Sequence, residues 1–377
     1  MLFRSNTGVG VAWADYDVDG DLDLYVANYN SPNGLYRNES DGTFSVVLGQ
    51  ANDADIAQSA SWADYDDDGD PDLYVGKSGA NVLYRNDGND VFTATGQAAD
   101  EGSASGVAWG DYDNDGYVDL YVTNDLTENV LYRNGGDGTL VETFQAADIN
   151  GAGRGAAWGD YDNDGDLDLY VANDGQANVL FANNLITASG SSNHWLQVDL
   201  NALISAPNGI GARVTVVAGG MHQTRYADGG SGWVSQNPTR LHFGLGEAMT
   251  VDSLIVEWPF GSVNELVAIP ADDTLSVEEI PLDIQPTHLV FTTQPGGSTS
   301  GQPLTTMPVV EAQDDAGYRA YGYGSTVTLS TTAGGTLSFF SKPFVDGRAT
   351  FDSLVYVATA DSQVVSLTAS SGLLTPA

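Results

Sequence analysis

Short apolar segments separated by Gly, Asn and Asp recur through the first half of the chain. Each set opens on Trp-x-Asp-Tyr-Asp, continues to Leu-Tyr-Val, and then reaches a second short apolar run of the type Leu-Tyr-Arg-Asn. Short segments that are rich in β-branched and aromatic residues and bounded by turn residues are typical of β-strands. The pattern therefore predicts strands joined by tight turns, and no helical pattern flanks these turns.

This set of segments occurs four times at nearly constant spacing. Its tryptophans, Trp13, Trp62, Trp109 and Trp158, are 49, 47 and 49 residues apart. Four strands in a repeat of this length match one propeller blade, so we expect an all-β fold with four visible blades. Residues 2–5 look like the end of an earlier blade, which favours an incomplete propeller over a compact four-bladed ring. We expect the repeated Trp and Tyr side chains in the blade cores.

Every Trp-x-Asp-Tyr-Asp segment begins a loop of the pattern D-x-D-x-D-G-x-x-D. Carboxylates at loop positions 1, 3 and 5 can turn inward, Gly at position 6 allows the sharp bend that a Cβ resists, and position 9 closes the shell. Position 7 is Tyr117 in the third copy, so we expect it to contribute its backbone carbonyl. The predicted side-chain ligands are Asp15, Asp17, Asp19, Asp23, Asp64, Asp66, Asp68, Asp72, Asp111, Asp113, Asp115, Asp119, Asp160, Asp162, Asp164 and Asp168.

The cation that fits these loops is calcium, because it takes six to eight oxygen ligands, whereas Mg²⁺ keeps more water. An EF-hand is one alternative, but its twelfth position is a bidentate Glu, and here that position is Val26, Val75, Val122 and Val171. Metal-free acidic turns are the other alternative, although carboxylates crowded together without a cation repel one another. We therefore predict about four structural Ca²⁺ ions, one for each loop.

The charge of the chain agrees with a surface that attracts cations. Acidic residues number 51 and Lys plus Arg only 12, which gives a formal net charge of −39 in 377 residues. Such a surface repels nucleic acid and anionic membranes, and no apolar stretch is long enough to cross a bilayer. Because the chain has no Cys, disulfides and thiolate chemistry are excluded, and a bacterial source is favoured for a secreted protein. No signal peptide is visible, and we expect the chain to be part of a longer one.

The repeats resemble the FG-GAP/VCBS family of calcium-binding propeller blades, over roughly residues 8–185. The resemblance rests on the Asp-rich loops, and it implies metal ligands at loop positions 1, 3, 5 and 9. The next segment, over about residues 190–280, is similar to the ASPIC/UnbV domain, and the two together resemble cartilage acidic protein-like proteins. That similarity rests on segments that include Asn193 to Leu200, Gly209 to Val214 and Leu241 to Gly246. It implies an order of domains more than an activity.

The last part of the chain, from about residue 286, resembles a bacterial immunoglobulin-like repeat, because alternating strands and Gly/Ser/Pro turns are typical of a β-sandwich. We therefore predict three domains. They are propeller repeats at residues 1–185, an ASPIC/UnbV β domain at residues 186–283, and an Ig-like β-sandwich at residues 284–377.

The sequence favours a non-catalytic, calcium-binding structural or adhesion module that is secreted or displayed at a bacterial cell surface. One alternative is a receptor that binds carbohydrate or protein on a propeller face. The other is a polysaccharide-active hydrolase or lyase, but carboxylate pairs carry little specificity in a chain with 51 acidic residues. The expected partners are extracellular protein or carbohydrate, with no nucleic acid and no membrane insertion.

Overall fold

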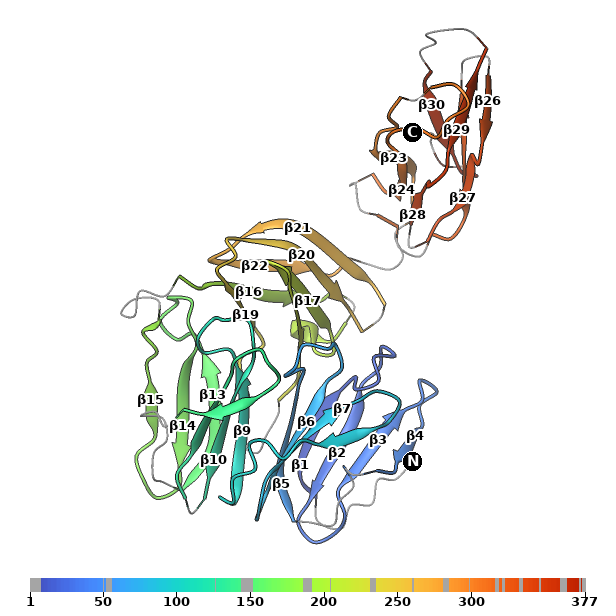
Figure 1. The fold of residues 1–377 in the computed structure, drawn as a ribbon. Coiled ribbons are helices and arrows are strands. Elements are labelled where there is room, and N and C mark those ends of the chain that lie inside the picture. The colour runs from blue at the N-terminus through green and yellow to red at the C-terminus, as the bar shows by residue number, and fades with distance from the viewer. Residues whose placement is uncertain are drawn as a thin grey trace. The chain divides into compact units, whose positions relative to one another are not determined.

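The computed structural model describes residues 8–374 apart from residues 50, 52–55, 126, 144–151, 186–191, 204, 231–234, 260, 281–284, 298, 316–318, 321–322, 332–334, 346, 360–364 and 373. This part of the chain is almost entirely β-structure and divides into two compact units, residues 1–279 and 280–377 (Figure 1). The predicted all-β class is confirmed. The predicted boundaries after residues 185 and 283, and the blade end expected at residues 2–5, fall outside the described residues.

The four repeats form four antiparallel sheets, each with its strands in chain order. A strand that ends on the Trp segment pairs with the Leu-Tyr-Val strand, so that Trp13 lies opposite Leu24 in the first blade. The first blade contains β1 (Gly8–Ala14), β2 (Asp23–Asn28), β3 (Gly34–Asn38) and β4 (Phe44–Val47). The second contains β5 (Ala57–Ala63), β6 (Asp72–Lys77), β7 (Val82–Asn86) and β8 (Phe92–Ala94). The third contains β9 (Ala104–Gly110), β10 (Asp119–Asn124), β11 (Val130–Asn134) and β12 (Leu140–Glu142), and the fourth β13 (Gly153–Gly159), β14 (Asp168–Asn173) and β15 (Val179–Phe181).

The blades pack in sequence through their first strands: β1 contacts β5, β5 contacts β9, and β9 contacts β13. Aromatic rings join neighbouring blades, because Tyr25 meets Trp62 edge-on and Tyr121 meets Trp158 in the same way. Among the described residues no comparable packing joins β13 to β1, so these four blades form an open arc. The expectation of buried Trp and Tyr holds inside the arc and is wrong at its ends, where Trp13 and Tyr161 are exposed because no neighbouring blade covers them.

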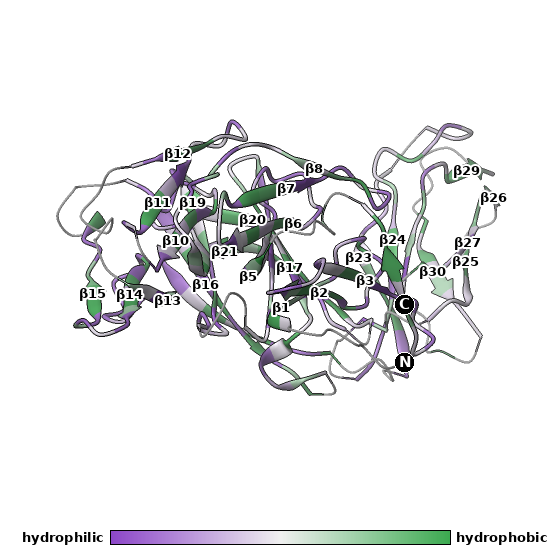
Figure 2. Cartoon of the chain, turned by 90° about the horizontal axis from the view of Figure 1, so that it is seen from below, coloured by the Kyte–Doolittle hydropathy of each residue, from purple (hydrophilic) through white to green (hydrophobic). Residues whose placement is uncertain are grey.

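Two further sheets complete the unit of residues 1–279. One has the order β19-β16-β22 and the other β18-β17-β20-β21. Strand β17 buries every second side chain, which places its apolar face on a core shared by the two sheets. Figure 2 shows hydrophobic colour along β20. The strands are β16 (His194–Asn201), β17 (Arg213–Ala218), β18 (Met221–Tyr226), β19 (Leu241–Gly246), β20 (Thr250–Glu257), β21 (Val263–Pro270) and β22 (Asp273–Glu278).

The unit of residues 280–377 has its own core, which includes Leu289, Val310, Val327 and Phe351. Its sheets have the orders β23-β24-β28, β27-β25-β30 and β26-β29. The assignment of this unit to the immunoglobulin-like family stays a prediction. Its strands are β23 (His288–Thr293), β24 (Val309–Gln313), β25 (Thr326–Thr331), β26 (Gly335–Ser338), β27 (Ser341–Pro343), β28 (Arg348–Thr350), β29 (Val355–Ala358) and β30 (Leu367–Ser370).

Candidate metal centres in the Asp loops

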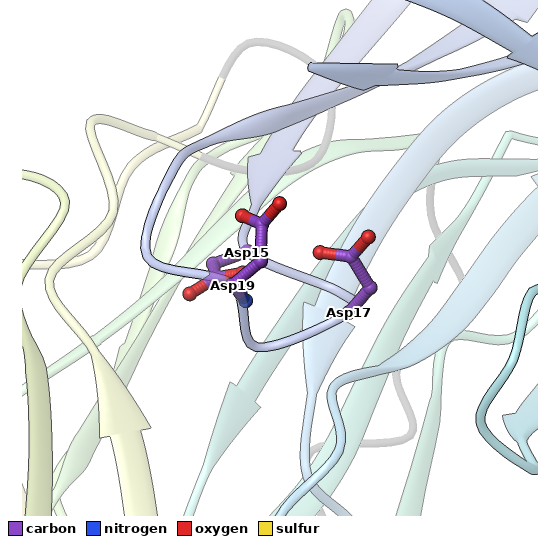
Figure 3. Close-up of side chains that lie close together, drawn as sticks. All are labelled: Asp15, Asp17 and Asp19. Atoms are coloured by element: carbon purple, nitrogen blue, oxygen red, sulfur yellow. Dashed lines mark hydrogen bonds between the residues drawn. The ribbon is translucent and has the colours of Figure 1, made fainter. Parts of the chain in front are cut away.

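Each Asp-rich loop connects the first two strands of its blade. Position 1 follows the Trp strand directly, and position 9 is the first residue of the next strand, as with Asp15 and Asp23 around the loop between β1 and β2. Figure 3 shows the side chains of Asp15, Asp17 and Asp19 arising from this single tight turn. The hairpin therefore brings residues of alternating position to one small volume.

The glycine at position 6 is required by the backbone. Its φ angle is +98°, +97°, +103° and +94° at Gly20, Gly69, Gly116 and Gly165. Residues with a Cβ rarely adopt such angles, whereas glycine does so without strain. The same bend directs backbone N–H groups into the loop.

Hydrogen bonds inside the loops repeat in all four copies. The two oxygens of the position 1 carboxylate accept the N–H groups of positions 5 and 6 at 2.9–3.2 Å. In the first loop, Asp15 Oδ1 accepts from Asp19 and Asp15 Oδ2 accepts from Gly20, both at 3.0 Å. The backbone thus fixes the position 1 carboxylate.

The position 9 carboxylate is also held by the backbone. Asp72 is fully buried, and its two oxygens accept the N–H groups of Tyr65 at 3.1 Å and Asn86 at 2.8 Å. The equivalent bonds occur in the other three loops. The position 9 carboxylate therefore connects the loop to the end of the third strand of its blade. Each of its two oxygens keeps a lone pair that could bind a cation.

The structure brings at least three carboxylates of each loop together, with ligand oxygens within 4.8 Å of one another. The sets use positions 1, 3 and 5 in the first and third loops and positions 1, 3 and 9 in the second and fourth. They are Asp15, Asp17 and Asp19; Asp64, Asp66 and Asp72; Asp111, Asp113 and Asp115; and Asp160, Asp162 and Asp168. Among the predicted ligands, Asp23, Asp68, Asp119 and Asp164 lie in the same loops outside these tightest sets.

The carboxylate at loop position 3 supplies the clearest available oxygen ligand for a cation. The Oδ1 atoms of Asp17, Asp66 and Asp113 are buried and have no hydrogen-bond partner within the described part of the chain. In the third loop Arg133 binds the other oxygen of Asp113 at 2.5 Å and Asp115 at 2.7 Å. A buried carboxylate oxygen without a partner is costly, and a cation among neighbouring carboxylates would remove that cost.

Burial also disfavours the charged form of these carboxyl groups in the absence of a cation. It raises the pKa of Asp15 to about 6, of Asp64 to about 7, of Asp23 to about 8 and of Asp72 to about 9, and nearby loop carboxylates add to the shift. Several carboxyl groups that protonate this readily form a site that a divalent cation would hold deprotonated. The residues therefore fit a hard, oxygen-bound cation.

A cavity of about 780 Å³ lies between the Asp loops and the two sheets of residues 192–279. The four repeat tryptophans contribute to its lining, together with Arg225 and His242 from the sheets. Arg225 carries a positive charge beside Asp64 and Asp111 and lowers their pKa values against the effect of burial. Sequence reasoning did not find this contribution, because Arg225 is far from the loops along the chain.

Family models match the two regions that form this unit. An FG-GAP-like repeat matches residues 15–75, 64–122 and 111–171, so each match contains two consecutive Asp loops. A model described as ASPIC and UnbV matches residues 203–281. The chain contains FG-GAP-like repeats and an ASPIC and UnbV domain. Both resemblances predicted from the sequence are confirmed.

The solved structures that are similar to this chain are distant. One, described as the structural basis of specific recognition of non-reducing terminal N-acetylglucosamine by an Agrocybe aegerita lectin, has 18% identity and a TM-score of 0.34, and the match covers 70% of this chain and 81% of the other. Another, BBS1N in complex with ARL6DN, has 12% identity and a TM-score of 0.30, and covers 82% and 78%. No curated protein matches the sequence. Similarities this low support no argument about function.

Proposed function

We propose that residues 1–279 form a calcium-stabilised, non-catalytic module of an extracellular bacterial protein, secreted or displayed at the cell surface, with a structural or adhesive role. The observation that carries the proposal is the set of buried Oδ1 atoms at position 3, which in three of the four loops have no hydrogen-bond partner among the described residues. Calcium prefers such carboxylate oxygens, and the loop geometry leaves them facing neighbouring carboxylates.

The extracellular location is supported by the FG-GAP-like repeats and by the strongly acidic composition. The absence of Cys favours a bacterial source for such a protein. Extracellular calcium is high enough to fill sites of modest affinity. No helix in the described part of the chain is long and apolar enough to span a membrane.

A non-catalytic role is supported by the backbone hydrogen bonds that the loop carboxylates in the cavity lining already accept. Four of the five aspartates in the lining belong to the Asp loops, and each accepts backbone hydrogen bonds within its own blade. They are Asp64, Asp111 and Asp160 at position 1 and Asp168 at position 9, and the fifth, Asp228, lies outside the loops. A hydrolase or lyase needs carboxyl groups that are free to exchange protons with substrate.

The cavity itself favours a second candidate, which is a receptor for an extracellular carbohydrate or peptide. Its lining combines indole rings with polar side chains such as Gln197 and Asn237, and pockets of this mixed character are typical of ligand sites. A bound saccharide would change the emission of the indole rings, and the calcium sites would then hold the receptor in shape.

The proposed function predicts the stoichiometry of calcium binding. Protein freed of divalent ions should bind about four Ca²⁺ per chain in a calorimetric titration, one in each loop. Asp64→Asn and Asp160→Asn should each remove one binding event, because each variant loses a position 1 carboxylate. Asp252→Asn, at an exposed aspartate on β20, is the matched control and should leave the stoichiometry unchanged. Binding that is absent, or that falls equally in the control, would exclude calcium as the function of the loops.

A further inference from the structure

Strand β19 forms the edge of its sheet and directs two of its amides toward the third Asp loop. Gly244 N donates to Asp111 Oδ2 at 3.1 Å, and Gly246 N donates to the carbonyl oxygen of Asn114 at 2.9 Å. Amides two residues apart on an edge strand point the same way and need a partner. The third Asp loop supplies that partner from 133 residues away.

Gly244 cannot carry a side chain in this position. A Cβ there would lie 2.1 Å from Asp111 Oδ2 and 2.5 Å from the backbone of Asn114. Here the requirement for glycine comes from the close approach of loop and strand, since its φ angle is not in the left-handed region. The Leu241 to Gly246 segment is therefore shaped by the loop beneath it.

The fourth loop receives a comparable bond from a side chain. Gln197, which is buried on β16, donates from Nε2 to Asp160 Oδ2 at 2.7 Å. The orientation of this amide is settled by its other end, because Arg240, which can only donate, and Thr274 both donate to Gln197 Oε1. Arg240 is itself held by two hydrogen bonds to Asp199.

Asn114 strengthens the same junction. Its Nδ2 donates to the carbonyl oxygen of Gly165 in the fourth loop, so its Oδ1 is the acceptor for His242 Nε2 at 2.7 Å. His242 stays neutral, since burial and the charge of Arg225 lower its pKa to about 3. The third and fourth loops are thus joined to each other and to the ASPIC and UnbV sheets.

The first two loops provide an internal contrast. The position 1 carboxylates Asp15 and Asp64 accept the N–H groups of positions 5 and 6 in their own loops. Asp111 and Asp160 accept those two bonds and, in addition, the donor from β19 or β16. A donor behind a metal-binding carboxylate orients it, and removal of such a partner typically weakens metal binding.

We propose that the ASPIC and UnbV domain completes the outer shell of the third and fourth metal sites, with Gly244 N and Gln197 Nε2 as positioning groups. Metal binding at these two loops and the docking of the domain then strengthen each other by the same factor. The first and second sites bind the cation without this help. The inference rests on the proposed function, because it requires that the loops hold calcium.

The test follows each site separately by NMR in protein labelled with ¹⁵N-glycine. The amides of Gly20, Gly69, Gly116 and Gly165 each donate to the position 1 carboxylate of their own loop, so each reports the filling of one site. Four variants that change the position 1 Asp to Asn, one in each loop, assign the resonances. Calcium is added stepwise to the metal-free full chain.

Gln197→Met keeps the length of the side chain and removes its donor. It should weaken calcium binding at the site reported by Gly165 by about tenfold to a hundredfold, while the sites reported by Gly20 and Gly69 keep their affinity. Gly244→Ala should weaken the site reported by Gly116 in the same way.

The control is Asn264→Leu, which removes buried hydrogen bonds to Trp258 and to the Glu278 carbonyl oxygen without touching a loop. It should leave all four affinities unchanged. If Gln197→Met leaves the fourth site unaffected in a protein that binds calcium, or if it weakens all four sites equally, the coupling is wrong. If the unaltered chain binds no calcium, the proposed function fails with it, and the two failures are distinguishable.

Discussion

Removal of calcium is expected to lower the melting temperature of residues 1–279 by more than about 10 °C. A site filled at about a hundred times its dissociation constant contributes about 2.7 kcal/mol, so four such sites supply a stabilisation comparable to the whole stability of a typical domain. For a unit of this size each kcal/mol moves the melting temperature by about 2–4 °C. Calorimetry of metal-free protein with and without added calcium measures the shift.

The second unit and an exposed aspartate of the same chain provide controls for this measurement. Every acidic cluster found in the described residues lies within residues 1–279, so the unit of residues 280–377 should unfold at a temperature that calcium does not change. Asp64→Ala and Asp160→Ala should each reduce the calcium-dependent rise, because each removes one position 1 ligand. The exposed Asp252→Ala should keep the full rise. A rise of equal size in all three variants would show that calcium acts elsewhere.

In the absence of metal, the melting temperature of residues 1–279 is expected to fall by at least about 5 °C between pH 5 and pH 8. Burial raises the pKa of Asp64 to about 7, of Asp23 to about 8 and of Asp72 to about 9, well above the usual value for an unfolded chain. Between about pH 4 and pH 9 the folded state therefore binds more protons than the unfolded state. Its free energy of unfolding must then decrease as the pH rises.

Calcium should reverse the fall of stability with rising pH, because the ion binds the deprotonated carboxylates and releases their protons. The gain in melting temperature from saturating calcium is thus expected to be larger at pH 8 than at pH 5. Asp72→Asn removes the group with the highest of these pKa values and should flatten the fall above pH 7, whereas Asp252→Asn should not. A metal-free protein whose stability stayed constant or rose over this range would contradict the assignment of raised pKa values to the loops.

The blades and loops could be predicted from the sequence because their signals are local. Trp13 and Leu24 become cross-strand neighbours through one tight turn, and the spacing of the Asp residues within that turn already places their carboxylates together. The glycine at position 6 belongs to the same local pattern. Such features depend on backbone geometry over about ten residues, which the sequence records directly.

The contacts between the loops and the ASPIC and UnbV sheets could not be predicted in this way. Gly244 donates a hydrogen bond to Asp111, 133 residues away in the sequence, and Gln197 donates one to Asp160, 37 residues away. The local sequence around Gly244 or Gln197 does not indicate which residue it contacts. The exposure of Trp13 and Tyr161 was missed for a similar reason, since the repeat is the same in every blade and only the neighbouring blade decides burial. Long-range packing thus determines these contacts and exposures, which the repeat pattern alone does not specify.

The most direct measurement of the central claim is anomalous diffraction from crystals grown with calcium. We expect one peak in each of the four loops, about 2.3–2.6 Å from carboxylate oxygens that include positions 1 and 3 and from the backbone carbonyl oxygen of position 7. Loops without peaks in crystals that bind calcium elsewhere would contradict it.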